Sequence, residues 1–209
     1  MKTHALLGCA LLLGACSTGP HAPRTYEIRA ALYEMPAALV EQLSGLSEPG
    51  VELRSETLFE RARMAARSRA EVQTLSSVTY LTGAGVPVGF SNLEKSEWVQ
   101  DYAVNAEWKS EPVKTTVFEG FEYELCPRPG ETGLELQYRF RRSVLQRPVR
   151  EVKITLSNGA QPLVHSLELD DRKLASSYEL GQGEMLAAWL PGSKPGRATL
   201  VCVRAAPAE

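Results

Sequence analysis

The chain has 209 residues, of which 44% are hydrophobic and 23% charged, and its formal net charge is −2 at pH 7. This composition is that of a folded domain with a hydrophobic core and excludes a wholly disordered chain. The slightly acidic balance disfavours nucleic acid as a partner, because nucleic-acid-binding domains are normally basic.

The chain begins with a pattern that is typical of a secretory signal. Lys2 supplies a positive charge, and the apolar run at 5–15 is shorter than the roughly 20 residues that span a bilayer. The run ends in LGAC at 13–16, which resembles the lipobox of bacterial lipoproteins. The resemblance implies cleavage after Ala15 and a diacylglycerol on Cys16. The alternative is an ordinary signal peptide cut near Ala15.

The lipobox also implies where the protein is held. Two or more acyl chains anchor a protein stably to a bilayer, whereas one chain holds it marginally. Ser17 follows the cysteine. By the usual sorting rule of two-membrane bacteria, a residue other than Asp at this position implies the outer membrane, with the domain facing the periplasm. We expect a signal peptide over 1–15, a tether over 16–24, and a single domain over 25–207.

The first part of that domain predicts a strand and two helices. TYEIRAALYEM at 25–35 alternates between apolar and polar residues, which is typical of a strand. Pro36 suits the first turn of a helix whose apolar stripe runs through 39–46. A capping-box pattern at Thr57 and Glu60 predicts a second helix. Its arginine-rich face is interpreted as solvated, and the alternative is contact with an anionic surface such as lipid headgroups.

From residue 71 onward the pattern is that of β structure. VQTLSSVTYLTGAGVPVGF at 72–90 predicts a hairpin around a glycine turn. TTVFEGFEYELC at 115–126 is either a strand pair or one strand bent at Gly120. GLELQYRFRR at 133–142 alternates most regularly. Further strands are predicted at 98–104, 151–156, 162–169, 177–180, 184–190 and 198–203. The series predicts an α+β fold that is mainly antiparallel β, as a sandwich or open barrel, with two N-terminal helices.

Two cysteines, Cys126 and Cys202, remain as thiols if Cys16 is acylated. Disulfides form in the periplasm, and a bridge between these two residues would stabilise the fold by roughly 4 kcal/mol in the chain-entropy model. Two separate buried thiols are the alternative, and sequence spacing leaves both open. The cysteines and histidines show no metal-binding spacing, so we expect no metal or cofactor.

Four segments give the domain a loose resemblance to one bacterial family. They are LSSVTYLTGAGVPVGF at 75–90, GFEYELCP at 120–127, LGQGEMLAAWLPG at 180–192 and ATLVCVRAAP at 198–207. Their order is similar to that of the core domain of secretins, the channels of type II and type III secretion and of type IV pili. The resemblance implies a shared β-rich fold and association with a secretion or pilus channel. Only PGSKPGR at 191–197 stands where secretins carry their pore-forming segment, so a self-sufficient channel is not implied.

The sequence contains one weak candidate for a catalytic site. His165 is the one histidine beyond the tether, and Ser166 with Asp170 or Asp171 would complete a hydrolase triad. No nucleophile motif supports that arrangement, so we expect no enzyme activity and interpret His165 as structural or surface.

Three hypotheses follow for the function. The leading one is a non-catalytic interaction or structural lipoprotein, which docks through an exposed edge strand to a secretion-system protein or to copies of itself. The second is a module that binds a ligand such as cell-wall glycan, using Trp98, Trp108 and the acidic strand face of Glu122 and Glu124. The third is a hydrolase that uses His165.

Overall fold

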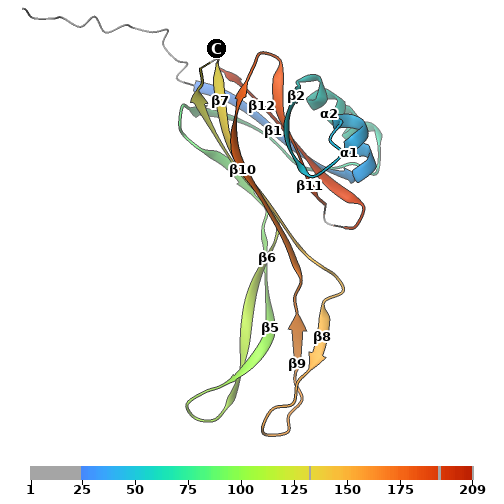
Figure 1. The fold of residues 1–209 in the computed structure, drawn as a ribbon, viewed down its shortest axis with the longest axis vertical. Helices are drawn as coiled ribbons and strands as arrows, with labels where there is room; N and C mark the ends of the chain where they lie inside the picture. The colour runs from blue at the N-terminus through green and yellow to red at the C-terminus, as the bar shows by residue number, and fades with distance from the viewer. Residues whose placement is uncertain (1–24, 132, 193, 209) are drawn as a thin grey trace, which may run out of the picture.

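The elements of this chain fall into two parts, a body and an arm (Figure 1). The computed structural model describes residues 25–131, 133–192 and 194–208. The expected signal peptide, the lipobox with Cys16, and the tether lie outside the described residues. The body holds two sheets and two helices, and the arm extends from one end of it as two β-hairpins. The start of β1 and the end of β12 (Arg197–Pro207) lie at the end of the body opposite the arm.

Sheet A has five antiparallel strands and includes both the first and the last strand of the chain. Their order is β2 (Gly50–Ser55), β11 (Glu184–Pro191), β12 (Arg197–Pro207), β1 (Thr25–Pro36) and β3 (Gln73–Gly83). β12 and β1 pair along their whole length, from Tyr26 opposite Pro207 to Pro36 opposite Arg197. Successive side chains of a strand point to opposite faces, so the unbroken apolar run Leu200–Val203 buries side chains on both faces of the sheet.

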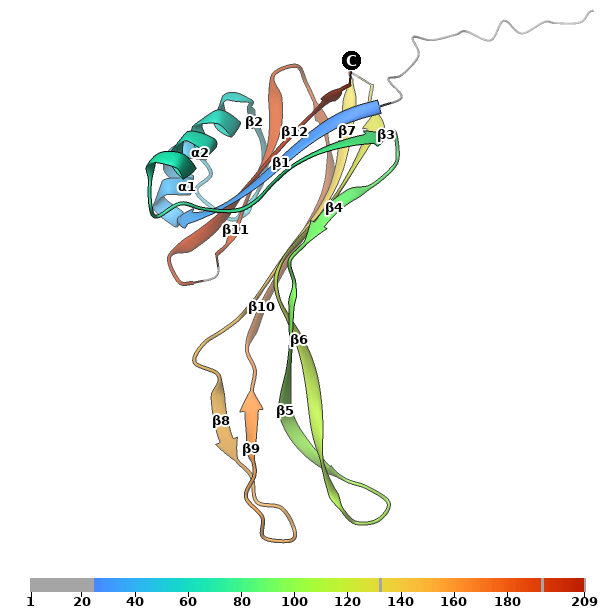
Figure 2. The ribbon, with the colours of Figure 1, turned by 180° about the vertical axis from the view of Figure 1, so that it is seen from behind.

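Two helices cover one face of sheet A (Figure 2). They are α1 (Ala37–Ser44) and α2 (Thr57–Ser68), and a hydrophobic cluster that includes Leu39, Leu58 and Leu200 fills the space between them and the sheet. Among the described residues, no helix has the length and apolar character needed to cross a membrane.

The predicted capping box of the second helix is wrong. Glu56 occupies the N-cap position, and Thr57 is the first helical residue. The Thr57 hydroxyl donates to Ser55 Oγ at 3.2 Å, in the strand before the helix. The hydroxyl is thereby engaged outside the helix, and the N-cap residue Glu56 makes no capping hydrogen bond through its side chain.

Sheet B stacks on the other face of sheet A. Its strands lie in the order β10 (Leu169–Leu180), β7 (Leu134–Leu145), β6 (Ser110–Pro129) and β4 (Val88–Ser91). The side chains predicted to point inward from 133–142 are buried between the two sheets, and those residues are Leu134, Leu136, Tyr138 and Phe140. The predicted class is confirmed, since the fold is mainly antiparallel β with two helices and its two sheets form a sandwich around this core.

The predicted hairpin at 72–90 is wrong in its pairing. Both strands exist, but β3 pairs with β1 in sheet A while β4 pairs with β6 in sheet B. The glycine turn carries the chain from one sheet to the other, and the Gly85 N–H donates to the Pro127 carbonyl at 2.7 Å. β3 pairs with β1 because β1 offers it a hydrogen-bonded partner along its whole length, whereas β4 has only four residues to offer.

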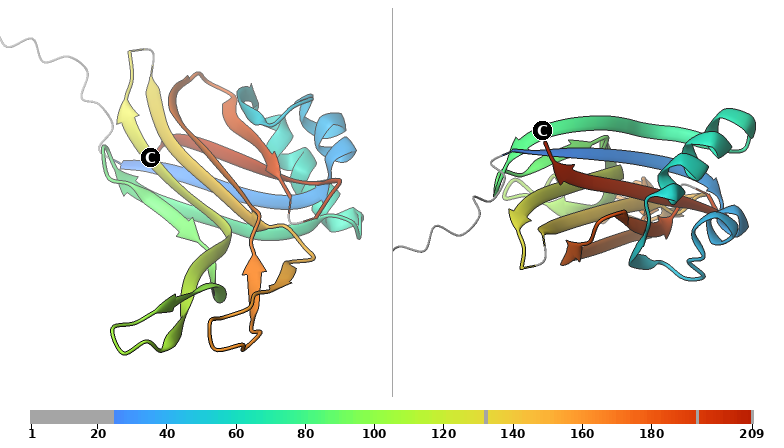
Figure 3. Two further views of the ribbon diagram at one scale, coloured as in Figure 1. Left: turned by 60° about the horizontal axis from the view of Figure 1, so that its bottom comes forward. Right: turned by 90° about the horizontal axis from the view of Figure 1, so that it is seen from above.

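The arm consists of residues 94–119 and 146–168. In it, β5 (Glu94–Val104) pairs with the first half of β6, and β8 (Arg150–Lys153) pairs with β9 (Leu163–Ser166). Figures 1 and 3 show the two hairpins next to each other and pointing away from the body.

β6 passes from the body into the arm without a break, which confirms the single bent strand as the correct alternative. The bend lies at Gly120, whose φ is 140°. A Cβ atom at this position would lie 2.5 Å from the carbonyl oxygen of Asn92. The junction of body and arm at residue 120, here called the neck, therefore requires glycine. Residues with a side chain rarely adopt this φ, and their Cβ would clash with Asn92.

Candidate functional site

The arm exposes an unusual share of the large apolar side chains. Of ten such side chains that are exposed among the described residues, six lie on the arm, and these are Val104, Trp108, Val113, Phe118, Val152 and Leu163. Neither hydrophobic core cluster of the body includes a residue of the arm. Val117 and Val164 of the arm are buried, but the six exposed side chains have no core cluster to cover them.

The two hairpins of the arm meet at His165 on β9. Its Nδ1 lies 3.1 Å from the carbonyl oxygen of Val99 on β5, and its ring stands edge-on to Trp98 at a centroid distance of 5.0 Å. Its Nε2 lies 3.9 Å from a carboxylate oxygen of Glu151 on β8. β5 and β9 come together here without forming a ladder of backbone hydrogen bonds. His165 is therefore a contact between hairpins, which agrees with its structural interpretation.

The structure does not bring together the two tryptophans that were predicted as ligand contacts. Trp98 is partly buried against His165, and its Nε1 donates to Ser96 Oγ at 2.8 Å. Trp108 lies in the turn between β5 and β6, where it is 89% exposed and has a φ of 60°. The side-chain oxygen of Asn105 accepts hydrogen bonds from the N–H groups of Glu107 and Lys109 and fixes that turn. The turn thereby holds one tryptophan out into solvent.

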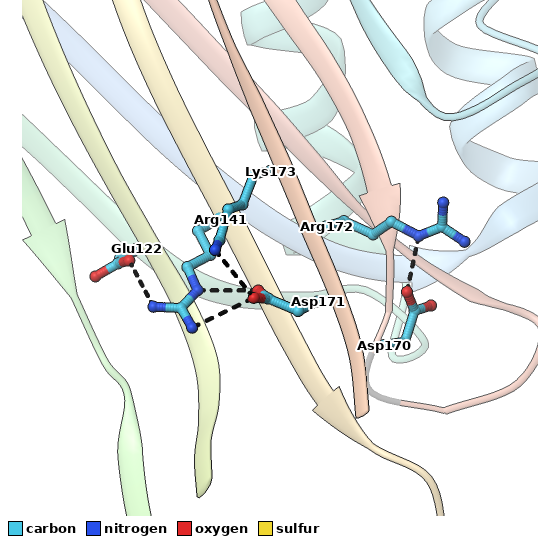
Figure 4. Close-up of polar contacts among 6 residues, drawn as sticks. All are labelled: Glu122, Arg141, Asp170, Asp171, Arg172 and Lys173. Carbon is cyan, nitrogen blue, oxygen red and sulfur yellow. Dashed lines mark hydrogen bonds and ion pairs between the residues drawn. The ribbon is translucent and has the colours of Figure 1, made fainter. Parts of the chain in front are cut away.

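Asp170 and Asp171, the carboxylates considered for a hydrolase triad, are both held in ion pairs (Figure 4). Asp171 accepts from Arg141 Nε at 2.9 Å and lies 3.3 Å from Lys173 Nζ, while Asp170 accepts from Arg172 Nε at 2.7 Å. Hydrogen bonding from Arg141 holds the pKa of the Asp171 carboxyl below its usual range. His165 contacts β5 and Glu151 instead, so the structure does not bring together the triad of the third hypothesis.

The acidic strand face lies on the outer, solvent-facing side of sheet B. Glu122 lies 3.3 Å from Arg141, and Glu124 stands opposite Arg139 in the ladder. A shallow hollow of about 460 Å³ runs across β6, β7 and β10, lined by Glu124, Cys126, Gln137, Arg139 and Ser177 among others. This face and the tryptophans lie on different parts of the molecule, so they do not form the single glycan site that the second hypothesis required.

The structure does not bring Cys126 and Cys202 together, and both are free thiols. Phe121, Tyr123 and Leu125 point inward from β6, so Cys126 points outward from sheet B. Cys202 points the opposite way, into the cluster between sheet A and the helices. The bridge considered from the sequence is therefore not formed. Burial raises the pKa of the Cys202 thiol to about 12, which makes it a poor nucleophile.

Sequence reasoning missed a buried ion pair at the end of the sandwich next to the arm. Arg142 Nη2 lies 3.5 Å from Glu34 Oε2, and both side chains are more than nine-tenths buried. Arg197 adds a hydrogen bond to the backbone oxygen of Glu34 at 3.0 Å. Burial lowers the pKa of the Arg142 guanidinium. The signal was present in the alternation of 133–142, because Arg142 has the same phase as Phe140 and must point inward.

No group of three or more His, Cys, Asp or Glu side chains that could hold a metal ion occurs within the part of the chain that the structure describes.

Comparison with known proteins shows no family and a distant likeness to solved structures of a secretin. No protein-family model and no curated protein matches the chain. Among solved structures, the secretin InvG of the Salmonella SPI-1 type III secretion injectisome is similar with a TM-score of 0.36 and 11% identity over 88% of this chain. A structure of the InvG secretin-domain β-barrel from the same injectisome gives a TM-score of 0.35 and 12% identity, again over 88% of this chain.

These matches cover 62% and 63% of the InvG chains, so this chain spans less than two thirds of the proteins that it resembles. The chain is distantly similar in structure to the InvG secretin domain.

Proposed function

We propose that this chain is a non-catalytic structural component of the bacterial envelope that assembles with other proteins through its arm. The proposal includes the anchor expected from the sequence, an acylated Cys16 in the outer membrane with the domain facing the periplasm. The observation that carries it is the set of six exposed apolar side chains on two hairpins that lie outside both core clusters of the body.

The energetics of hairpins support a partner for the arm. An isolated two-stranded hairpin is marginally stable in water, and independent stability needs further strands or a packed layer. The two hairpins meet where His165 contacts Val99 and Trp98, and no ladder between β5 and β9 joins them in the described part of the chain. Exposed apolar surface on a soluble domain marks an interaction site. A partner that covered these side chains would therefore supply the layer that the arm lacks.

The position of the arm suits this role. β1 begins at the end of the body opposite the arm, as Figure 1 shows. An anchor on the N-terminal side of β1 would leave the arm free to meet a secretion-system protein or copies of this chain.

The test replaces three exposed arm residues, Val104, Val113 and Phe118, by serine. The matched control replaces Met64 and Val86, which are equally exposed but lie on the body. Complexes are isolated from envelopes in a mild detergent, and their mass is measured by sedimentation. We expect the arm variant to lose the larger complex and the control to retain it, with the thermal unfolding midpoint unchanged in both. An arm variant that assembles like the unmodified chain would contradict the proposal.

A second candidate function is glycan binding, which the exposure of Trp108 at the tip of the arm favours. Aromatic side chains held out from a surface offer apolar faces to sugar rings. Cosedimentation with purified peptidoglycan tests this, with Trp108→Ala as the variant and Trp98→Ala as the matched control. Loss of binding only in Trp108→Ala would support it, and absence of binding by the unmodified chain would exclude it.

A further inference from the structure

From Ser76 to Gly83, the edge strand β3 lacks the features by which proteins usually protect the edges of their sheets. Edges are normally kept from pairing by charged side chains, proline, short length or a bulge. β3 has eleven residues, QTLSSVTYLTG, and none is charged or proline. Its one register shift lies near its start, where it pairs with Leu32 and Tyr33, and the pairing from Ser76 to Gly83 is regular.

The other edge strands of the two sheets are protected. β2 has six residues and carries Glu52 and Arg54, and β4 has only four residues. β10 is as long as β3, but it holds five charged residues, namely Asp170, Asp171, Arg172, Lys173 and Glu179. Among the edges that the structure describes, β3 is the long one without such protection.

The free side of β3 is open. It is the last strand of sheet A, beyond β1, and Figure 3 shows it as the outer rim of that sheet when the molecule is seen from above. Ser77, Thr79 and Leu81 are exposed, Leu81 to 70%. In the described part of the chain, the backbone of β3 makes one hydrogen bond outside its ladder with β1, from the Val86 N–H to the Gly83 carbonyl at 3.1 Å.

We propose that β3 is the docking edge for a second copy of this chain, which pairs with it antiparallel about a twofold axis. The two five-stranded sheets would then form one continuous sheet. An antiparallel twofold pairing presents the same backbone donors and acceptors from each copy, so a single open edge is complementary to itself. With the axis near the middle of the regular stretch, Thr79 of one copy lies next to Thr79 of the other.

Local charge favours a second copy over a charged partner strand. The residues of β1 that lie beside Thr79 and Leu81 are Arg29 and Glu27, and these two form an ion pair with each other. The edge and its immediate surroundings therefore carry no net charge. Two such edges meet without like charges in opposition, and Leu81 of each copy gains cover from the neighbouring strand. This docking edge is separate from the arm and does not depend on the function proposed for it.

The test places a charge at the centre of the edge. Thr79→Lys and Thr79→Glu are prepared in the full chain that also carries the three serine substitutions of the arm, so that assembly through the arm does not contribute. The processed proteins are purified in a mild detergent, and their self-association is measured by sedimentation velocity at low salt. The parent is expected to be dimeric, and each charged variant to dissociate with a dissociation constant raised about fivefold or more. An equimolar mixture of the two variants is expected to regain the dimer.

The matched control is Ser177→Lys, an exposed position on the edge strand β10. It should leave the dimer unchanged, and at concentrations low enough for every protein to be monomeric all variants should keep the thermal unfolding midpoint of the parent. A monomeric parent at every concentration would overturn the proposal, as would an equal loss of the dimer in Ser177→Lys. Failure of the mixture to regain the dimer would place the contact elsewhere and would overturn it too.

Discussion

Body and arm are both built from paired antiparallel strands, yet they differ in what covers those strands. Leu200–Val203 of β12 is an unbroken apolar run that is buried on both faces, because sheet B lies on one side and the helices on the other. β5 and the first half of β6 also pair with each other, but neither core cluster includes their residues, and Phe118 and Val113 remain 42% exposed. Strand pairing alone therefore does not bury an apolar side chain, because burial depends on the layers that the rest of the chain supplies.

Two phenylalanines of one strand, Phe121 and Phe118, test this difference most strongly. Phe121 is fully buried between the sheets, with its ring centroid 6.3 Å from that of Phe140, while Phe118 is exposed on the arm. Phe121→Ala should lower the free energy of unfolding by about 3–5 kcal/mol, since it leaves a cavity in the core. Phe118→Ala should change it by less than about 0.5 kcal/mol. Urea titration of both variants measures this, and equal losses would show that the arm has a core of its own.

The buried ion pair at the arm end of the body gives the next largest effect. Arg142→Met removes one of the two arginines beside the buried Glu34 carboxylate and leaves Arg197 at 3.8 Å, and it should cost about 3 kcal/mol of unfolding free energy, because a charge in the core loses a counter-charge. The double variant Glu34→Leu with Arg142→Met should recover much of that loss, since it removes both charges. Urea titrations of the two single variants and the double variant form the test. A loss in the double variant equal to the sum of the two single losses would contradict the assignment of Glu34 and Arg142 as a coupled ion pair.

The sequence predicted the strands, the inward phase of 133–142 and the two helices, because each depends on neighbours along the chain. It did not predict the partners of those strands. The segment at 72–90 has every local mark of a hairpin, yet its two halves belong to different sheets because β1, far away in sequence, offers the longer ladder.

The candidate sites show the same limit. The sequence named His165 and Trp98 separately, but their edge-on contact arises only because two hairpins distant in sequence lie next to each other. The two cysteines were too far apart along the chain for their spacing to decide whether they pair. Cys126 points outward from sheet B and Cys202 points toward the helices, and these directions depend on how the layers stack.

The bend at Gly120 should be the next most sensitive point, since it joins the two regions. Gly120→Ala should cost about 1–3 kcal/mol of unfolding free energy and should reorient the arm, because the new Cβ meets the Asn92 carbonyl at 2.5 Å. Gly159→Ala is the control. Its φ of 80° is also positive, but no atom lies within 4 Å of the added Cβ. Small-angle scattering and urea titration measure both effects. A larger cost at Gly159 would show that the close approach at the neck is unimportant.

The smallest effect concerns the ion pairs on the outer face of sheet B. Asp171 is a quarter exposed and bound to Arg141, so Asp171→Asn should cost less than about 1 kcal/mol of unfolding free energy at pH 7. Asp170→Asn is the matched control, because its partner Arg172 is 63% exposed, and its cost should be smaller still.

The pH dependence of that effect has a definite sign. Hydrogen bonding to Arg141 holds the pKa of Asp171 below its usual value of 3.8 in the folded chain. As the pH falls, the unfolded chain therefore takes up this proton before the folded one does, and the folded state loses its advantage. The difference in unfolding free energy between the unmodified chain and Asp171→Asn should be constant above about pH 5 and should shrink as the pH falls through the folded pKa. Urea titrations at a series of pH values measure it. A difference that grew on acidification would mean that the carboxylate is disfavoured in the fold, and the ion pair with Arg141 would then not be a stabilising contact of this face.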